Sequence, residues 1–241
     1  MTALELIVRG LAYAGLVAEG LCVVSFLVTG MARHLPAVFG FLAYLFLSDA
    51  FLVAVVPASE SWRALVITTY ISYLFEAAAI TELAVRVALT ARLKTASKRV
   101  RVTALWCTFL MLATFLMANP RSYGDFGVEE GHFLRVDLTA AIFRALAFVA
   151  LLVSRRRDKW VHYTLAVRIT LLFAVYAIGD LLMHIFNELG PWLRLPGSAF
   201  EISECVCGYA WIILLVVITW QVMTHTAPAR ACLSDSAAGT A

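Results

Sequence analysis

Polar residues with chemically useful spacing occur inside two strongly apolar segments. Asp180 and His184, in YAIGDLLMHIF, are four residues apart and so share one face of a helix. This spacing suits either a hydrogen-bonded pair or two ligands of one metal ion. Glu201 and Glu204 share a face at the start of the next apolar segment. Because the connection between these segments is short, we expect the four side chains to face one another.

Further ionisable residues lie in apolar segments, where each costs about 2.5 to 3.5 kcal/mol at the centre of a membrane helix. Residues with this cost usually face a partner or a water-filled cavity. The candidate ligand-binding residues are Glu19, Asp49, Glu76, Asp137, Arg144, Asp180, His184, Glu201 and Glu204. So many acids need a compensating positive charge, either from Arg144 or from a bound guest. The set therefore predicts a site for a small cation, an amine or a proton.

Two alternatives to this site stay open. The same residues could form interhelical hydrogen bonds, each worth about 0.6 to 2 kcal/mol, that hold the helices together. His184 with Asp180 and either Glu201 or Glu204 could also supply three ligands to zinc, whereas a neutral His184 bonded to Asp180 needs no metal. We assign no metal and expect no cofactor.

The chain lacks the residues that several kinds of membrane-protein chemistry require. All three lysines lie in predicted loops, which excludes a Schiff base to retinal. His184 is the only histidine well inside an apolar segment, too few for axial haem ligation. Cys205 and Cys207 are two residues apart and point to nearly opposite faces of a helix, so they cannot form a local disulfide. We therefore interpret both as small buried apolar residues. No set of nucleophile, base and orienting residue is visible, so we do not expect an enzyme.

The composition indicates the elements that position these residues. Hydrophobic residues make up 62% of the chain and charged residues 15%, a balance typical of membrane proteins. Apolar stretches near the roughly 20 residues that cross a bilayer cover residues 3–30, 36–56, 62–91, 102–119, 133–154, 160–187 and 199–224. The predicted fold is all-α, a bundle of seven transmembrane helices over residues 1–225 with a short disordered tail over 226–241.

Basic residues indicate the orientation, because cytoplasmic loops hold an excess of lysine and arginine. One end of the predicted bundle has eleven: Arg33, Arg92, Lys94, Lys98, Arg99, Arg101, Arg155, Arg156, Arg157, Lys159 and Arg230. The other end has four: Arg63, Arg121, Arg135 and Arg194. The N-terminus is therefore predicted outside and the C-terminus in the cytoplasm, in a multi-pass protein of the cell inner membrane. The basic runs adjoin helix ends and anionic headgroups, so the predicted partner is the lipid bilayer and not a nucleic acid.

A second group of charges has a structural interpretation. Glu82 and Arg86 are four residues apart with the acid first, the favourable order along a helix, and we expect them to stabilise the fold. A transport path from the candidate site to the cytoplasm would need these two residues or Arg168.

Internal similarity relates the two ends of the chain. AYLFLSDAFL resembles AVYAIGDLLM, which places Asp49 against Asp180, and RGLAYAGLV from Arg9 resembles RALAFVALLV from Arg144. A parallel repeat of three helices, one linking helix and three helices would explain both matches, as in some transporters. Chance similarity between apolar segments is the alternative.

Three features also resemble those of small uncharacterised bacterial seven-helix membrane proteins. They are LPAVFGFLAYLFLSDAFL at the start of the second span, YISYLFEAAAITEL in the third, and the basic loop that follows. The resemblance covers most of the chain and implies the seven-helix architecture, but it transfers no site.

We therefore expect a membrane protein that binds a small cationic or protonatable ligand in an outward-facing polar cavity, for transport or for sensing. The alternative is a structural or accessory subunit of a larger membrane complex, with a membrane-protein partner and with the charges as interhelical contacts.

Overall fold

The computed structural model describes residues 3–55, 61–90, 130–156, 165–189, 192–194 and 197–238. The helices in these ranges are α1 (Ala3–Thr29), α2 (Met31–His34), α3 (Pro36–Ala54), α4 (Ser61–Thr90), α6 (Glu130–Arg156), α7 (Leu165–Leu189) and α8 (Gly197–Ala238). The predicted all-α class is thus confirmed over the described part of the chain. The predicted span over 102–119 lies outside it. Because α8 continues to Ala238, the division into a domain over 1–225 and a tail stays a prediction.

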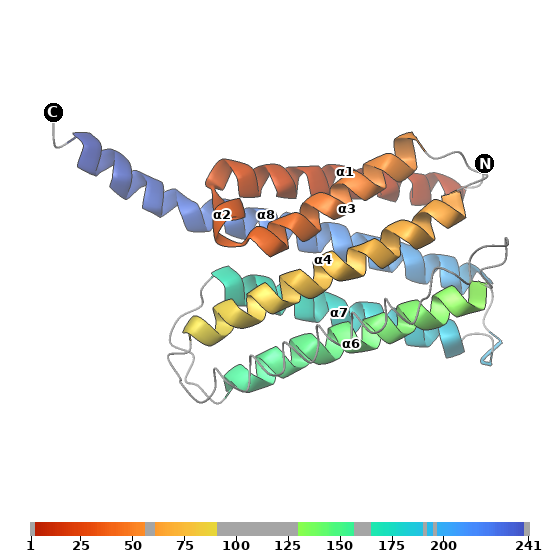
Figure 1. Cartoon of the computed structure of the whole chain (residues 1–241). Helices are drawn as coiled ribbons and strands as arrows, with labels where there is room; N and C mark the ends of the chain where they lie inside the picture. Colours follow the sequence, from red (N-terminus) through yellow and green to blue (C-terminus); the bar gives the residue numbers. More distant parts are fainter. Residues whose placement is uncertain are drawn as a thin grey trace.

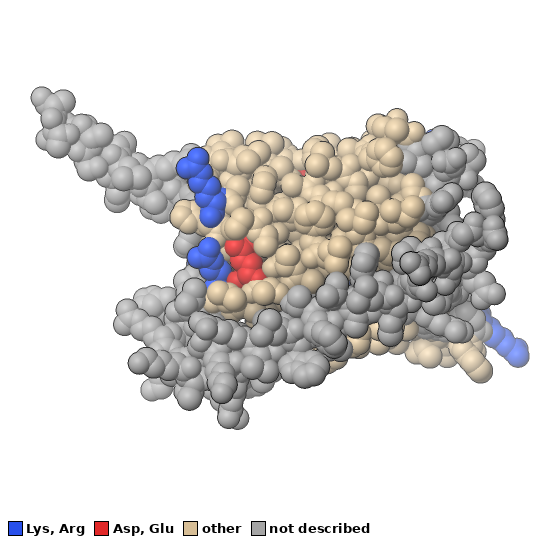
Figure 2. Space-filling model, in the orientation of Figure 1, with Lys and Arg blue, Asp and Glu red and all other residues tan. Residues whose placement is uncertain are grey.

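The outer surface of the described helices is suited to lipid. Five helices are long and apolar enough to cross a membrane, through Arg9–Thr29, Pro36–Ala54, Ala64–Arg86, Leu165–Asn187 and Cys205–Thr224. Large apolar side chains such as those of Val17, Leu21 and Val24 on α1 are more than half exposed. Figure 2 shows that on one face the described Lys, Arg, Asp and Glu side chains lie mostly near the ends of the molecule, with a belt of uncharged residues between them. These features indicate a bilayer environment.

The long helices pack as a ring. Contacts run in the order α1, α3, α4, α6, α7, α8 and back to α1, and Figure 1 shows these helices lying lengthwise beside one another. α4 and α6 run in the same direction (Figure 1), in keeping with the contacts of Tyr73 with Asp137 and of Glu76 with Arg144. α6 and α7 run in opposite directions, as do α7 and α8.

Two glycines and a proline shape the passage from α1 to α3. Gly30 has a φ of 76°, which glycine adopts without a steric penalty, and it ends α1. Pro36 begins α3, where its missing N–H group removes no helical hydrogen bond. A Cβ atom on Gly20 would lie 3.1 Å from a ring carbon of Phe46, so glycine allows α1 to approach α3 closely.

Glu82 and Arg86 fasten the same passage to α4. Glu82 Oε2 accepts hydrogen bonds from the backbone N–H groups of Ala37 at 2.8 Å and Val38 at 3.0 Å, which satisfies free donors at the start of α3. Arg86 Nη2 donates to the carbonyl oxygen of His34 at 2.7 Å. Both residues therefore have structural contacts, and these contacts reach from α4 to the α2–α3 connection.

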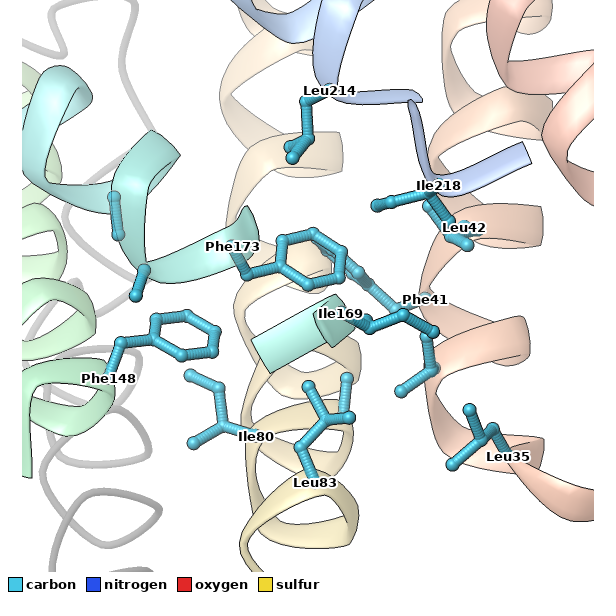
Figure 3. Close-up of a cluster of buried hydrophobic side chains, with 14 of the residues drawn as sticks. Leu35, Phe41, Leu42, Ile80, Leu83, Phe148, Ile169, Phe173, Leu214 and Ile218 are labelled. Carbon is cyan, nitrogen blue, oxygen red and sulfur yellow. The ribbon is translucent and has the colours of Figure 1, made fainter. Parts of the chain in front are cut away.

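The core of the bundle is apolar. Figure 3 shows side chains from α3, α4, α6, α7 and α8 converging between the helices. The labelled members are Leu35, Phe41, Leu42, Ile80, Leu83, Phe148, Ile169, Phe173, Leu214 and Ile218. The rings of Phe148 and Phe173 are stacked with centroids 6.0 Å apart, so this core joins α6 to α7 just beyond the polar residues described next.

Candidate functional site

Arg144 ties three helices together inside the bundle. Its Nε donates a hydrogen bond to Glu76 Oε1 of α4, and its Nη1 donates to Asp180 Oδ2 of α7. The exposed fraction is 14% for the Arg144 side chain and 9% for each carboxylate. When both carboxylates are ionised, one arginine leaves one negative charge uncompensated, at a depth where an unpaired charge is costly.

Asp137 and His184 adjoin this ion-pair network. Tyr73 OH donates to Asp137 Oδ1 at 2.6 Å. His184 Nε2 lies 3.5 Å from Asp137 Oδ2 and 3.7 Å from Asp180 Oδ1. The imidazole thus stands between two carboxylates and beyond the usual length of a hydrogen bond to each. We call the set Glu76, Asp137, Arg144, Asp180 and His184 the Arg144 cluster.

A cysteine of α8, Cys207, lies close to Asp180. Cys207 Sγ lies 4.0 Å from Asp180 Oδ1 and 3.9 Å from Tyr176 OH. We expected a small apolar residue at this position, but its thiol adjoins a carboxylate and a phenol. The side chains of Glu201 and Glu204 lie outside the described residues, so their contact with Asp180 and His184 stays a prediction.

Glu19 of α1 and Asp49 of α3 form a second acidic site, which we call the carboxyl pair. Glu19 is 2% exposed, and its Oε1 accepts a hydrogen bond from Trp211 Nε1 of α8 at 2.9 Å. Its Oε2 is buried and has no hydrogen-bond partner among the described groups. Asp49 lies beside it. No basic side chain that the structure describes forms an ion pair with either carboxyl group.

A central cavity of about 200 Å³ joins the carboxyl pair to the Arg144 cluster. Its polar lining consists of Glu19, Asp49, Ser72, Glu76 and Arg144. Its aromatic lining consists of Phe41, Phe148, Phe173, Tyr176 and Trp211. At roughly 30 Å³ per water molecule, the cavity has room for a few waters or for a ligand of a few non-hydrogen atoms.

A second cavity, of about 220 Å³, lies among α1, α3 and α8. It shares Glu19, Asp49 and Trp211 with the central cavity, and Cys205 and Gly208 are among its other lining residues. The carboxyl pair and the Trp211 indole therefore form a wall common to both cavities.

The predicted site residues divide into three groups. Those that line the central cavity are Glu19, Asp49, Glu76 and Arg144. Those that belong to the Arg144 cluster without lining the central cavity are Asp137, Asp180 and His184. Those whose side chains are not described are Glu201 and Glu204. Within the described residues no three His, Cys, Asp or Glu side chains are placed to hold a metal ion.

Three participants were not among the predicted site residues, although their spacing gave a signal. Trp211 and Cys207 are seven and three residues beyond Glu204, which puts them on the same helical face. Tyr73 is three residues before Glu76 and shares its face by the same rule. Tyr, Trp and Cys side chains are also common in apolar cores, so their types alone did not single these residues out. No protein-family model matches the chain, and comparison with curated proteins and with solved structures finds no match.

Proposed function

We propose that this protein binds a small organic cation in its central cavity. The observation that carries the proposal is the Oε2 atom of Glu19, which is buried and without a described hydrogen-bond partner, in a cavity wall beside Asp49. A carboxylate left in this state is costly in an apolar environment. A bound cation would supply the missing charge and the missing donor.

The lining favours an ammonium ion over a hydrated metal ion. Tyr176 and Trp211 both face the cavity, and their rings pack together with centroids 4.9 Å apart. Aromatic faces attract organic cations, with Trp the most favourable ring. A metal cation would instead need several oxygen ligands around it. We therefore propose an alkylammonium ion of a few carbon atoms as the class of ligand.

We further propose that the chain spans the inner membrane seven times, with its N-terminus outside. α4 and α6 run in the same direction (Figure 1), and this parallel arrangement supports the predicted span over 102–119. The excess of basic residues at the α2 end supports a cytoplasmic position for that end. In this orientation Asp49 lies in the outer half of its span, Pro36–Ala54.

This cavity is compatible with transport and with sensing. The two functions differ in the movement that they require of the helices on the cytoplasmic side of the cavity. Three polar residues that could have formed a path inward have structural partners: Glu82 and Arg86 hold the α2–α3 connection, and Arg168 Nη1 donates to Gln221 Oε1 at 2.7 Å. The apolar core of Figure 3 adjoins the cavity and shares Phe41, Phe148 and Phe173 with its lining. Transport would require the helices to separate there, whereas sensing requires only that occupancy of the cavity changes how they pack.

A role as an accessory subunit is the second candidate, and one observation favours it. Arg144 joins α4, α6 and α7 through buried ion pairs, as expected of charges that serve as interhelical contacts. Extraction in a mild detergent followed by mass spectrometry tests this role. A stoichiometric companion chain would support it, and a monodisperse single chain would count against it.

Thermal unfolding of the purified protein tests cation binding. Methylammonium, tetramethylammonium, sodium and potassium chlorides are compared at equal ionic strength, with Glu19→Gln as the test variant and Glu82→Gln as the control. Glu82 is a carboxylate of α4 outside the cavity lining. We expect an organic ammonium ion to raise the Tm of the wild type and of Glu82→Gln but not that of Glu19→Gln. Equal shifts in all three proteins, or no shift in any, would refute the proposal.

A further inference from the structure

We infer that the carboxyl pair holds one shared proton when the cavity is empty and releases it when a cation binds, which makes the cavity a site of cation/proton exchange. The inference rests on the proposed function and adds a second ligand, the proton, with a fixed stoichiometry. In the exchange, the protonated pair and a cation give the ionised pair with its bound cation and one proton in solution, so that charge and atoms balance.

Among the described residues around the carboxyl pair, no other group is free to balance its negative charge. Trp211 donates one hydrogen bond to Glu19, and this neutral bond leaves both charges in place. Arg144 lines the same cavity, but its Nε and Nη1 atoms are engaged by Glu76 and Asp180. The remaining titratable neighbours carry no positive charge: Cys22, Tyr44, Glu76, Tyr176 and Cys205.

A shared proton resolves this geometry without any further group. Two adjacent carboxyl groups with no cation between them commonly bind a single proton as a unit. The protonated carboxyl group then donates a hydrogen bond to the other. Because Glu19 Oε2 otherwise lacks a described partner, a proton on that atom or on Asp49 would satisfy it.

The two halves of the ring support the same inference. The predicted sequence repeat would place Asp49 of α3 against Asp180 of α7. Asp180 forms an ion pair with Arg144 of α6, whereas the neighbour of Asp49 on α1 is Glu19. In one half of the molecule the aspartate thus has an arginine as its neighbour, and in the other half the aspartate has a second acid beside it. A proton and an external cation are the two guests that could alternate there.

Proton release on binding tests the exchange directly. Full-length protein in weakly buffered detergent solution is mixed with the ammonium ion that gives the largest Tm shift, and the pH is followed with an indicator dye. We expect about one proton released per cation bound, and an affinity that falls about tenfold for each unit of decrease in pH over the range where the pair is protonated. The Glu82→Gln control should release the same amount. Binding without proton release would overturn the inference and leave the proposed function standing.

Infrared difference spectroscopy tests the proton in the empty site, independently of any cation. We expect the wild type without added ammonium to show the C=O stretch of a protonated carboxyl group that is absent from the Glu19→Gln/Asp49→Asn double variant. Both replacements keep the size of the side chain, and a Glu19→Asp variant, which keeps the acid, should retain the band at a shifted frequency. Identical spectra of the wild type and the folded double variant would overturn the inference even if a cation binds.

Discussion

Arg144 is the residue whose contacts leave the least freedom for substitution. It forms ion pairs with carboxylates on two other helices, and all three side chains are largely buried. Removing one partner of a buried ion pair leaves an uncompensated charge, which typically costs about 3 to 5 kcal/mol. The guanidinium group is also planar and holds two acceptors at once, which a lysine cannot reproduce.

We therefore predict that Arg144→Gln lowers the free energy of unfolding by about 3 to 5 kcal/mol, with a fall in Tm on the order of 10 °C. Arg168→Gln is the matched control, because Arg168 is half-buried and its described polar partner is the neutral Gln221; its loss should cost about 1 kcal/mol. Adding Glu76→Gln and Asp180→Asn to Arg144→Gln should recover most of the stability. Thermal unfolding in one detergent measures all four proteins, and equal losses in the two arginine variants would contradict the prediction.

The identity of the polar residues was predictable, and their partners were not. Charges in an apolar segment stand out because lipid penalises them, so Glu19, Asp49 and Arg144 could be selected from the sequence. Which of them meet depends on how each helix is rotated, and apolar packing on all sides sets that rotation. Hence the spacing placed Cys207 on the helical face of Glu204, but the sequence could not show that its thiol adjoins Asp180.

At the scale of the elements, the α2–α3 connection depends on a cap supplied by another helix. Glu82 accepts two backbone N–H groups at the start of α3, a place where helices usually use a side chain of their own. Spacing along α4 predicted a structural role for Glu82 and Arg86, but it pointed to a pair within one helix. Contacts between segments 44 and 45 residues apart leave no local pattern in a sequence.

We predict that Glu82→Ala lowers the free energy of unfolding by about 1 to 2 kcal/mol, the usual cost of a lost cap, without changing the affinity of the central cavity for an ammonium ion. Glu82→Gln should lose less, because the amide oxygen still accepts from the backbone. Chemical unfolding and a binding titration on the same preparations separate the two effects. Weakened binding in a stably folded Glu82→Ala would show that the cap and the cavity are coupled.

At the scale of the whole molecule, the fold class and the apolar belt followed from composition. The boundaries of the predicted spans lie within a few residues of the described helices, except at the start of α7 and at the end of α8. Apolar length is a strong signal because the bilayer has a fixed thickness. The closed ring of six described long helices was not predictable, since a list of spans does not say which helices touch.

Single cysteines at the two ends of the bundle test the orientation. Trp192 and Arg33 are exposed in turns or helix ends at opposite ends of the described helices. In a background in which the native cysteines are replaced, we predict that a membrane-impermeant thiol reagent labels Trp192→Cys in intact cells and labels Arg33→Cys only after the membrane is opened. The opposite pattern would place the N-terminus in the cytoplasm and the carboxyl pair on the inner side.

The ion pairs of Arg144 also have a consequence for biogenesis. Glu76 and Arg144 are 68 residues apart, and Asp180 follows Arg144 by 36 residues. At about 5 to 20 residues per second of synthesis, α4 leaves the ribosome several seconds before its counter-ion exists. During that interval, placing the unpaired Glu76 side chain in lipid costs about 2.5 to 3.5 kcal/mol. Retention of α4 at the insertion machinery until α6 arrives would avoid this cost. The three helices that Arg144 joins in the folded protein would then enter the bilayer as a group, although the chain delivers them one at a time.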